Sequence, residues 1–154
     1  IKSVEKVFKT DFYSSMYAIN MLMPLLKKSN APAIINFSSL YSNNYPTSDS
    51  LKNSVCSAFQ SYIQDLSQAL GKTFYVAYFI YGDIQEDKIA YKSKIYKLFV
   101  NSVEKLTNKA IYAILKKKKR AVFGADAKFY DKIKRYFPSK SNGIIDKISK
   151  TFIR

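Results

Sequence analysis

The chain has 154 residues, of which 47% are hydrophobic and 24% charged, with one cysteine and no histidine. These counts exclude a disulfide framework, a zinc site and a Ser-His-Asp triad, and they favour one globular domain in a reducing, cytoplasmic setting. The net charge is +15, and residues 81–154 hold 19 Lys and Arg against 7 Asp and Glu, so either a solvated surface or an anionic partner must account for the basic half.

The first half of the chain predicts a helix, a strand and a second helix. Apolar residues repeat at helical spacing over residues 2–28, where Pro24 is expected to loosen the last turn. The run AIINF at 33–37 is apolar throughout, which predicts a strand covered on both faces. An amphipathic helix over 49–70, ending at Gly71, follows. The opening IKSVEKVFKT already follows the helical pattern, so we expect a chain that continues a longer one.

The second half alternates in the same way and ends in a basic tail. The expected elements are a buried strand over 73–81, helices over 87–100 and 103–116 (the second capped by Ser102), a strand over 121–123, and basic amphipathic helices over 128–136 and 144–153. This order predicts an α/β fold. Cys56 is expected to act as a small buried hydrophobe, and the turn with Asp83, Glu86 and Asp87 as a solvated turn rather than a metal site.

Three consecutive segments resemble the second half of a short-chain dehydrogenase/reductase: MLMPLL, then AIINFSS, then SDSLKNSVCSAFQSYIQDLSQAL. In that family, a helix with a Leu-Pro step leads to a strand ending in two serines and then to a helix that opens with Tyr-x-x-x-Lys. The tail AVFGADAKFYDKIKRYFP is similar to the end of some acyl-chain reductases of the family. The resemblance implies the C-terminal part of a Rossmann-like doubly wound parallel sheet, a single domain over 1–154 that lacks the N-terminal glycine-rich cofactor unit.

The chemistry that this resemblance implies is hydride exchange between NAD or NADP and a small carbonyl or alcohol, with a lipid-like substrate as one option. A serine orients the carbonyl, a tyrosine passes the proton, a lysine lowers the tyrosine's pKa and holds the ribose, and an asparagine supports a water relay. The resemblance places Ser39 at the serine and Lys52 at the lysine. It places Ser48 at the tyrosine and Asp11 at the asparagine, so we expect impaired catalysis or an inactive relative that serves as a binding or assembly module.

The cofactor side departs from the family as well. Gly82 corresponds to the glycine of a Pro-Gly pair in the family, and Ile84 lies two residues after it. Glu86 is at the position where the family has a threonine that binds the nicotinamide amide. The loop from Ser39 to Ser48 is about four residues shorter than the family spacing, and no two of the four glycines are close enough to form a phosphate-cradling turn.

Tyr45 is an alternative candidate for the missing phenol. It lies seven residues before Lys52, which is about 10 Å along a continuous helix and too far for direct tuning. A rearranged loop would bring it closer, so Tyr45 is either a proton donor or a plain loop aromatic. A Ser48–Lys52 hydrolase pair is also conceivable from the spacing, but no glycine-rich oxyanion turn lies beside it.

Two kinds of partner besides a substrate follow from the sequence. Family members commonly pair through two long helices, here 2–28 and 49–70, so the resemblance implies a homo-oligomer. The basic half predicts either a solvated edge or a face for an anionic membrane or nucleic acid, with the chain then peripheral at a membrane surface. The residues of that face are the run 116–120, the basic residues Lys128, Lys132, Lys134 and Arg135, and the aromatic residues Phe129, Tyr130, Tyr136 and Phe137.

Overall fold

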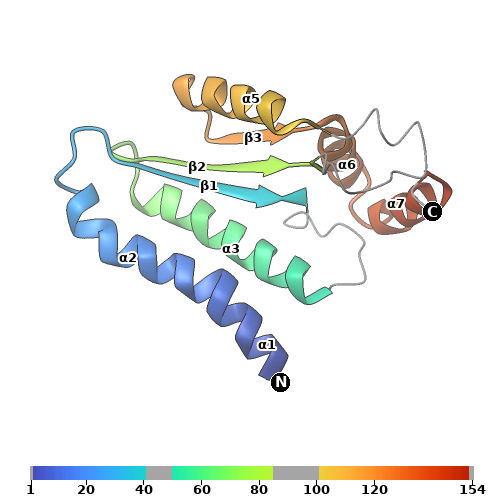
Figure 1. Ribbon diagram of the computed structural model, residues 1–154, viewed down its shortest axis with the longest axis horizontal. Helices are drawn as coiled ribbons and strands as arrows, with labels where there is room; N and C mark the ends of the chain where they lie inside the picture. Colours follow the sequence, from blue (N-terminus) through green and yellow to red (C-terminus); the bar gives the residue numbers. More distant parts are fainter. Residues whose placement is uncertain (1, 41–49, 85–100, 153–154) are drawn as a thin grey trace.

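A computed structural model describes residues 2–40, 50–84 and 101–152 and shows a parallel sheet between layers of helices (Figure 1). The sheet has three strands in the order β1-β2-β3, which are β1 Ala33–Ser39, β2 Tyr75–Tyr81 and β3 Arg120–Phe123. The helices are α1 Lys2–Val7, the π-helix η1 Phe8–Tyr13, α2 Ser14–Leu26, α3 Ser50–Ala69, α5 Val103–Leu115, α6 Ala125–Tyr136 and α7 Ser141–Phe152. The α/β class is therefore confirmed.

The predicted elements that fall on described residues are all present. The first predicted helix is a continuous helical segment through Leu26, but a π-helical turn divides it, which apolar spacing alone does not reveal. The tail helices α6 and α7 each begin three residues earlier than expected. The helix predicted over 87–100 lies outside the described residues. No helix among the described residues is long and apolar enough to cross a membrane.

Strand β2 has a neighbouring strand on each side and is buried on both faces. On one face, Val76 and Ile80 belong to a cluster with Phe59 and Ile63 of α3 and with Tyr130 of α6. Because side chains alternate along a strand, the intervening residues of β2 face the other layer. The apolar and aromatic sequence that predicts this strand is therefore explained by the layers of helices that cover both of its faces.

A second cluster lies on the opposite face of the sheet, beneath α5. There Ala77 and Phe79 of β2 pack with Leu106 and Ala110 of α5 and with Phe123 of β3. Figure 1 shows α5 on one side of the sheet and α2 and α3 on the other. The three-layer arrangement expected of a Rossmann-like portion is thus present around three strands.

Strand β1 departs from its prediction. Among the described residues it pairs with β2 alone, and the side chain of Phe37 is 51% exposed although its ring lies 5.5 Å from that of Phe79. The expectation that both faces of β1 are covered is therefore wrong for the described part of the chain. On one face Ile34 is buried in the cluster beneath α3, whereas on the other face Ile35 packs only partly buried against the cluster beneath α5. Cys56 is likewise half-buried rather than buried.

The ends of two helices confirm the local signals in the sequence. Gly71 follows α3 with φ +64°, the left-handed conformation that glycine adopts without strain. Ser102 precedes α5, and its side-chain oxygen accepts a hydrogen bond from the backbone N–H of Lys105 at 3.3 Å. These two caps set where α3 and α5 stop and start beside the strands.

Candidate functional site

The carboxyl ends of all three strands stop at the same level. Ser39 of β1 is paired in register with Tyr81 of β2, and Tyr81 is paired with Phe123 of β3. In open α/β sheets, ligands bind in the crevice outside the carboxyl ends of parallel strands. This carboxyl edge is therefore the candidate site, and it is formed by the segments that the resemblance singled out.

Ser39 and Lys52 approach this edge from opposite layers. Ile34 lies on the α3 face, so strand alternation places Ser38 on that face and Ser39 on the face of α5. Ser38 is buried and Ser39 half-buried. Lys52 is exposed in the first turn of α3, which follows β1 along the chain. A ligand that contacts both side chains must therefore lie across the end of the sheet rather than within one layer.

The remaining predicted site residues do not all lie at the carboxyl edge of the sheet. The side chain of Asp11 is exposed on η1, Gly82 is buried directly after β2, and Ile84 is half-buried. Tyr45, Ser48 and Glu86 lie outside the described residues. The structure thus brings Ser39, Gly82 and Ile84 to one edge of the sheet, with Lys52 in the adjoining helix.

A half-buried carboxylate, that of Asp126, occupies the space between the ends of β2 and β3. The backbone N–H of Asp83 donates a hydrogen bond of 2.6 Å to Oδ2 of Asp126, and Nδ2 of Asn101 donates one of 3.3 Å to Oδ1. Burial raises the pKa of Asp126 above its ordinary range, although the hydrogen bond from Asp83 opposes this. Asp126 and Asn101 therefore join the ends of β2 and β3 through a contact between residues 43 apart in sequence.

The two glycines of this edge explain how the carboxylate fits. A Cβ added to Gly82 would lie 2.0 Å from Oδ1 of Asp126, and one added to Gly124 would lie 2.4 Å from the same atom. The resemblance assigned Gly82 to the cofactor side, and its visible role is to leave room for Asp126. Sequence reasoning did not single out Asp126 as a site residue, although the segment GADAK that contains it was quoted for the resemblance.

The basic face expected from the sequence is divided by the fold. The run 116–119 precedes β3, whereas α6 follows its opposite end. Tyr130 is 2% exposed and belongs to the core, so its placement on that face is wrong. Arg120 and Arg135 both form ion pairs with Asp131. Two separate basic regions result.

The side chain of Asp126 allows a test by pH. Because its pKa is raised in the folded chain, its contribution to stability is full below the ordinary value of 3.8 and is lost as the pH rises through the folded value. We expect the stability of the unaltered chain to fall relative to Asp126→Asn as the pH rises above about 4, measured by urea unfolding at each pH. Asp65→Asn, at an exposed position on α3, is the control, and an equal trend in both variants would contradict the role of burial.

The functional groups at the edge are the hydroxyl of Ser39, the ammonium of Lys52, the Asp126 carboxylate with the Asn101 amide, and backbone groups. Among residues 2–40, 50–84 and 101–152, no group of three or more Cys, Asp or Glu side chains is placed to hold a metal ion. No family model matches the sequence, and a search of curated proteins finds no significant match. The site must therefore be interpreted from its own residues.

Proposed function

We propose that the chain is the substrate-side portion of an NAD(P)-dependent oxidoreductase, similar to the short-chain dehydrogenase/reductases and of reduced efficiency, which acts on a carbonyl or alcohol. The observation that carries the proposal is the level, parallel ending of β1 and β2 with Ser39 at the edge and Lys52 in the first turn of the next helix. At these two functional positions the sequence has the same residue types, serine and lysine, as the family that it resembles.

The described residues fit one end of such a cofactor. The exposed ammonium of Lys52 suits ribose hydroxyls, and the half-buried hydroxyl of Ser39 suits a carbonyl oxygen. The pyrophosphate end has no counterpart here, because the chain has no glycine-rich turn and the Asp126 carboxylate lies against Gly82 and Gly124. When bound, the cofactor would supply the hydride, and the missing cradle is a reason to expect weak binding by these residues alone.

The chain's own residues would orient the substrate, hold the ribose and assist proton transfer. Ser39 would donate a hydrogen bond to the substrate oxygen and so orient the carbonyl, while Lys52 would hold the ribose and place a positive charge beside the proton donor. The phenol expected four residues before Lys52 is Ser48, and an ordinary alcohol is a much weaker acid than a phenol. We therefore propose that proton transfer is the impaired step, unless Tyr45 supplies the proton.

A second candidate function is a non-catalytic relative that assembles with other chains. It is favoured by Ser48 at the tyrosine position and by the apolar outer stripe of α2, where Tyr17, Met21 and Leu25 are 58%, 80% and 65% exposed. These residues are spaced by four and so lie along one side of the helix. This candidate predicts self-association without turnover, in line with the pairing through helices that the resemblance implies.

Turnover of carbonyl substrates separates the two candidates. With NADH or NADPH and a panel of aldehydes, ketones and long-chain acyl carbonyls, we expect slow reduction whose kcat/KM falls about 100-fold in Lys52→Ala, the low end of acid–base contributions. Ser39→Ala should show a similar loss, and Tyr45→Phe abolishes turnover only if Tyr45 donates the proton. The control Lys9→Ala, an exposed lysine on η1, should match the unaltered chain. Self-association with no turnover of any carbonyl would favour the second candidate.

A further inference from the structure

The three turns that lead into the three parallel strands carry only positive charge. They span residues 27–32, 70–74 and 116–119, and none of them contains an aspartate or glutamate. We call their lysines the basic edge, which consists of Lys27, Lys28, Lys72, Lys116, Lys117, Lys118 and Lys119. All seven are exposed. Because parallel strands all begin at one edge of a sheet, the fold gathers lysines that are distant in sequence.

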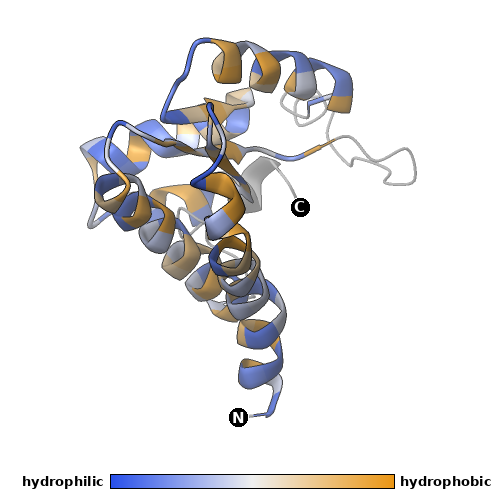
Figure 2. Ribbon diagram, turned by 90° about the vertical axis from the view of Figure 1, so that its left-hand side faces the viewer, coloured by the Kyte–Doolittle hydropathy of each residue, from blue (hydrophilic) through white to orange (hydrophobic). Residues whose placement is uncertain are grey.

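Hydrogen bonds hold the three turns together. The backbone N–H of Tyr75, at the start of β2, donates to the carbonyl of Pro32 in the first turn at 2.9 Å. The hydroxyl of the same tyrosine donates to the carbonyl of Lys118 in the third turn at 3.0 Å. Figure 1 shows the three turns at the end of the sheet from which the arrows start, opposite the candidate site, and Figure 2 faces this end. The basic edge is therefore one surface.

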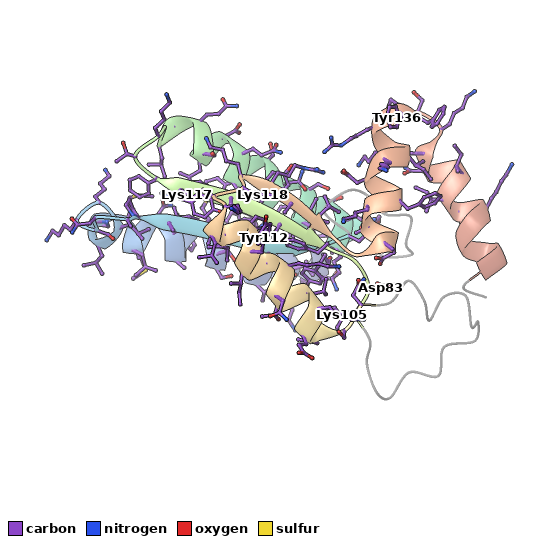
Figure 3. All side chains as sticks on the ribbon, turned by 90° about the horizontal axis from the view of Figure 1, so that it is seen from above. Asp83, Lys105, Tyr112, Lys117, Lys118 and Tyr136 are labelled. Carbon is purple, nitrogen blue, oxygen red and sulfur yellow. The ribbon has the colours of Figure 1, made fainter. Side chains whose placement is uncertain are left out.

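The charge of this surface is not neutralised by the parts of the chain that the structure describes. The ion pairs among the described residues join Arg120 and Arg135 to Asp131. No carboxylate in the described ranges pairs with a lysine of the basic edge. Instead, the ammonium groups of Lys116 and Lys118 each lie 5.8 Å from the ring centroid of Tyr112. Figure 3 shows Tyr112, Lys117 and Lys118 at this end of α5. Gathered like charges destabilise a fold unless they meet an anion.

The backbone of Lys117 adds an independent observation. Lys117 follows α5 with φ 48°, and the N–H groups of Lys117 and Lys118 donate to the carbonyls of Ile114 and Ala113, which is the Schellman arrangement. The corresponding position after α3 is Gly71, the residue that favours this conformation. At the end of α5 the chain therefore has a lysine where glycine would be more stable.

Exposed apolar side chains border these lysines. Leu25 is 65% exposed two residues before Lys27, and Leu115 is 75% exposed directly before Lys116. Figure 2 shows hydrophobic helix segments beside hydrophilic turns on this side of the molecule. Lysines beside projecting leucines and a tyrosine are typical of surfaces that dock on a bilayer. Arginine, with its planar, bidentate guanidinium, is the basic side chain preferred in nucleic-acid recognition, and the basic edge contains none.

We propose that the basic edge, together with Leu25 and Leu115, docks onto a bilayer surface that carries anionic lipids. The lysines meet the headgroups and the two leucines enter the interfacial layer, with no helix crossing the membrane. Because the basic edge lies opposite the carboxyl edge, the candidate site around Ser39 faces away from the bilayer. This surface operates whether or not the chain transfers hydride.

Vesicle sedimentation tests the proposal with two variants of equal charge. We expect the chain to bind phosphatidylcholine vesicles that contain phosphatidylserine and not to bind vesicles of phosphatidylcholine alone. Moderate salt should release the bound chain. The combination Lys27→Gln, Lys28→Gln, Lys116→Gln and Lys118→Gln should weaken the partition coefficient by about fivefold per lysine, equivalent to about 1 kcal/mol each. The control combination Lys6→Gln, Lys9→Gln, Lys128→Gln and Lys132→Gln removes the same charge elsewhere and should change binding much less.

Equal losses in the two combinations would overturn the proposal, since general charge would then explain the binding. Salt-independent binding, or tighter binding to a short DNA duplex than to the vesicles, would overturn it as well. Leu115→Ser changes no charge and exposes no core, so unchanged vesicle binding in this variant would exclude the apolar contact that distinguishes a bilayer from other polyanions.

Lys117→Gly gives a further readout that loss of folding cannot imitate. We expect it to raise Tm by about 2 to 4 °C, because glycine relieves the left-handed conformation, and to weaken vesicle binding about fivefold. A higher Tm with undiminished binding would show that the turn after α5 does not contact the bilayer, contrary to the proposal.

Discussion

Replacement of Phe79 by alanine is expected to destabilise the chain by about 3 to 5 kcal/mol, the usual range for a buried phenylalanine. Phe79 lies in the central strand and is 0% exposed. Its ring centroid is 5.5 Å from that of Phe37 and 5.4 Å from that of Phe123, with both pairs edge-on. Removal of the ring leaves a cavity that touches all three strands, so the backbone has little freedom to close it. Urea unfolding followed by circular dichroism measures the effect.

Tyr136→Ala is the matched control for Phe79→Ala. Tyr136 is also aromatic, but it is 77% exposed at the end of α6, and we expect its loss to change stability by less than about 0.5 kcal/mol. If the two variants differed by less than about 1 kcal/mol, the packing of β2 between two layers would be contradicted.

Gly124→Ala is expected to destabilise the chain by about 2 to 4 kcal/mol, because two penalties combine at this position. The backbone of Gly124 has φ +104°, which side chains other than that of glycine rarely accept. A Cβ there would also lie 2.4 Å from Oδ1 of Asp126 and 2.6 Å from Nδ2 of Asn101. The methyl group must displace the carboxylate and break hydrogen bonds to a half-buried charge. Thermal and urea unfolding measure the loss.

Gly71→Ala separates the two penalties. Gly71 also has a positive φ, +64°, but nothing lies within 4 Å of an added Cβ, so only the backbone strain of about 1 kcal/mol applies. The excess loss in Gly124→Ala then measures the crowding against Asp126 and Asn101. Equal losses in both variants would mean that the carboxylate does not occupy the space beside Gly124.

The fold was predictable wherever local patterns determine structure. Apolar spacing locates α3, an unbroken apolar run locates β2, and Gly71 and Ser102 mark helix ends, because each signal depends on residues close in sequence. The π-helical turn η1 and the exposed face of β1 were not predictable. The first depends on a small shift in backbone hydrogen bonding, and the second on which segments cover a strand, which is a long-range property.

The candidate site was predictable only in part, for a similar reason. The resemblance assigned Ser39 and Lys52, which lie at the end of a predicted strand and in the helix that follows it. Asp126 acquires its role from Asn101 and from the backbone of Asp83, 43 residues earlier, and no local pattern contains that contact. Tyr130 is amphipathic in a basic helix, so sequence alone does not separate a core position from a surface one. The basic edge likewise exists only because parallel strands bring three turns together.

Titration of the chain with NADH and with NADPH, followed by the fluorescence of the reduced nicotinamide, tests the proposed function most directly. We expect a saturable change with at least one of the two cofactors, abolished in Lys52→Ala and retained in the control Lys9→Ala. Absence of a saturable change with both cofactors, or equal binding by Lys52→Ala, would contradict a nicotinamide site at the carboxyl edge of the sheet.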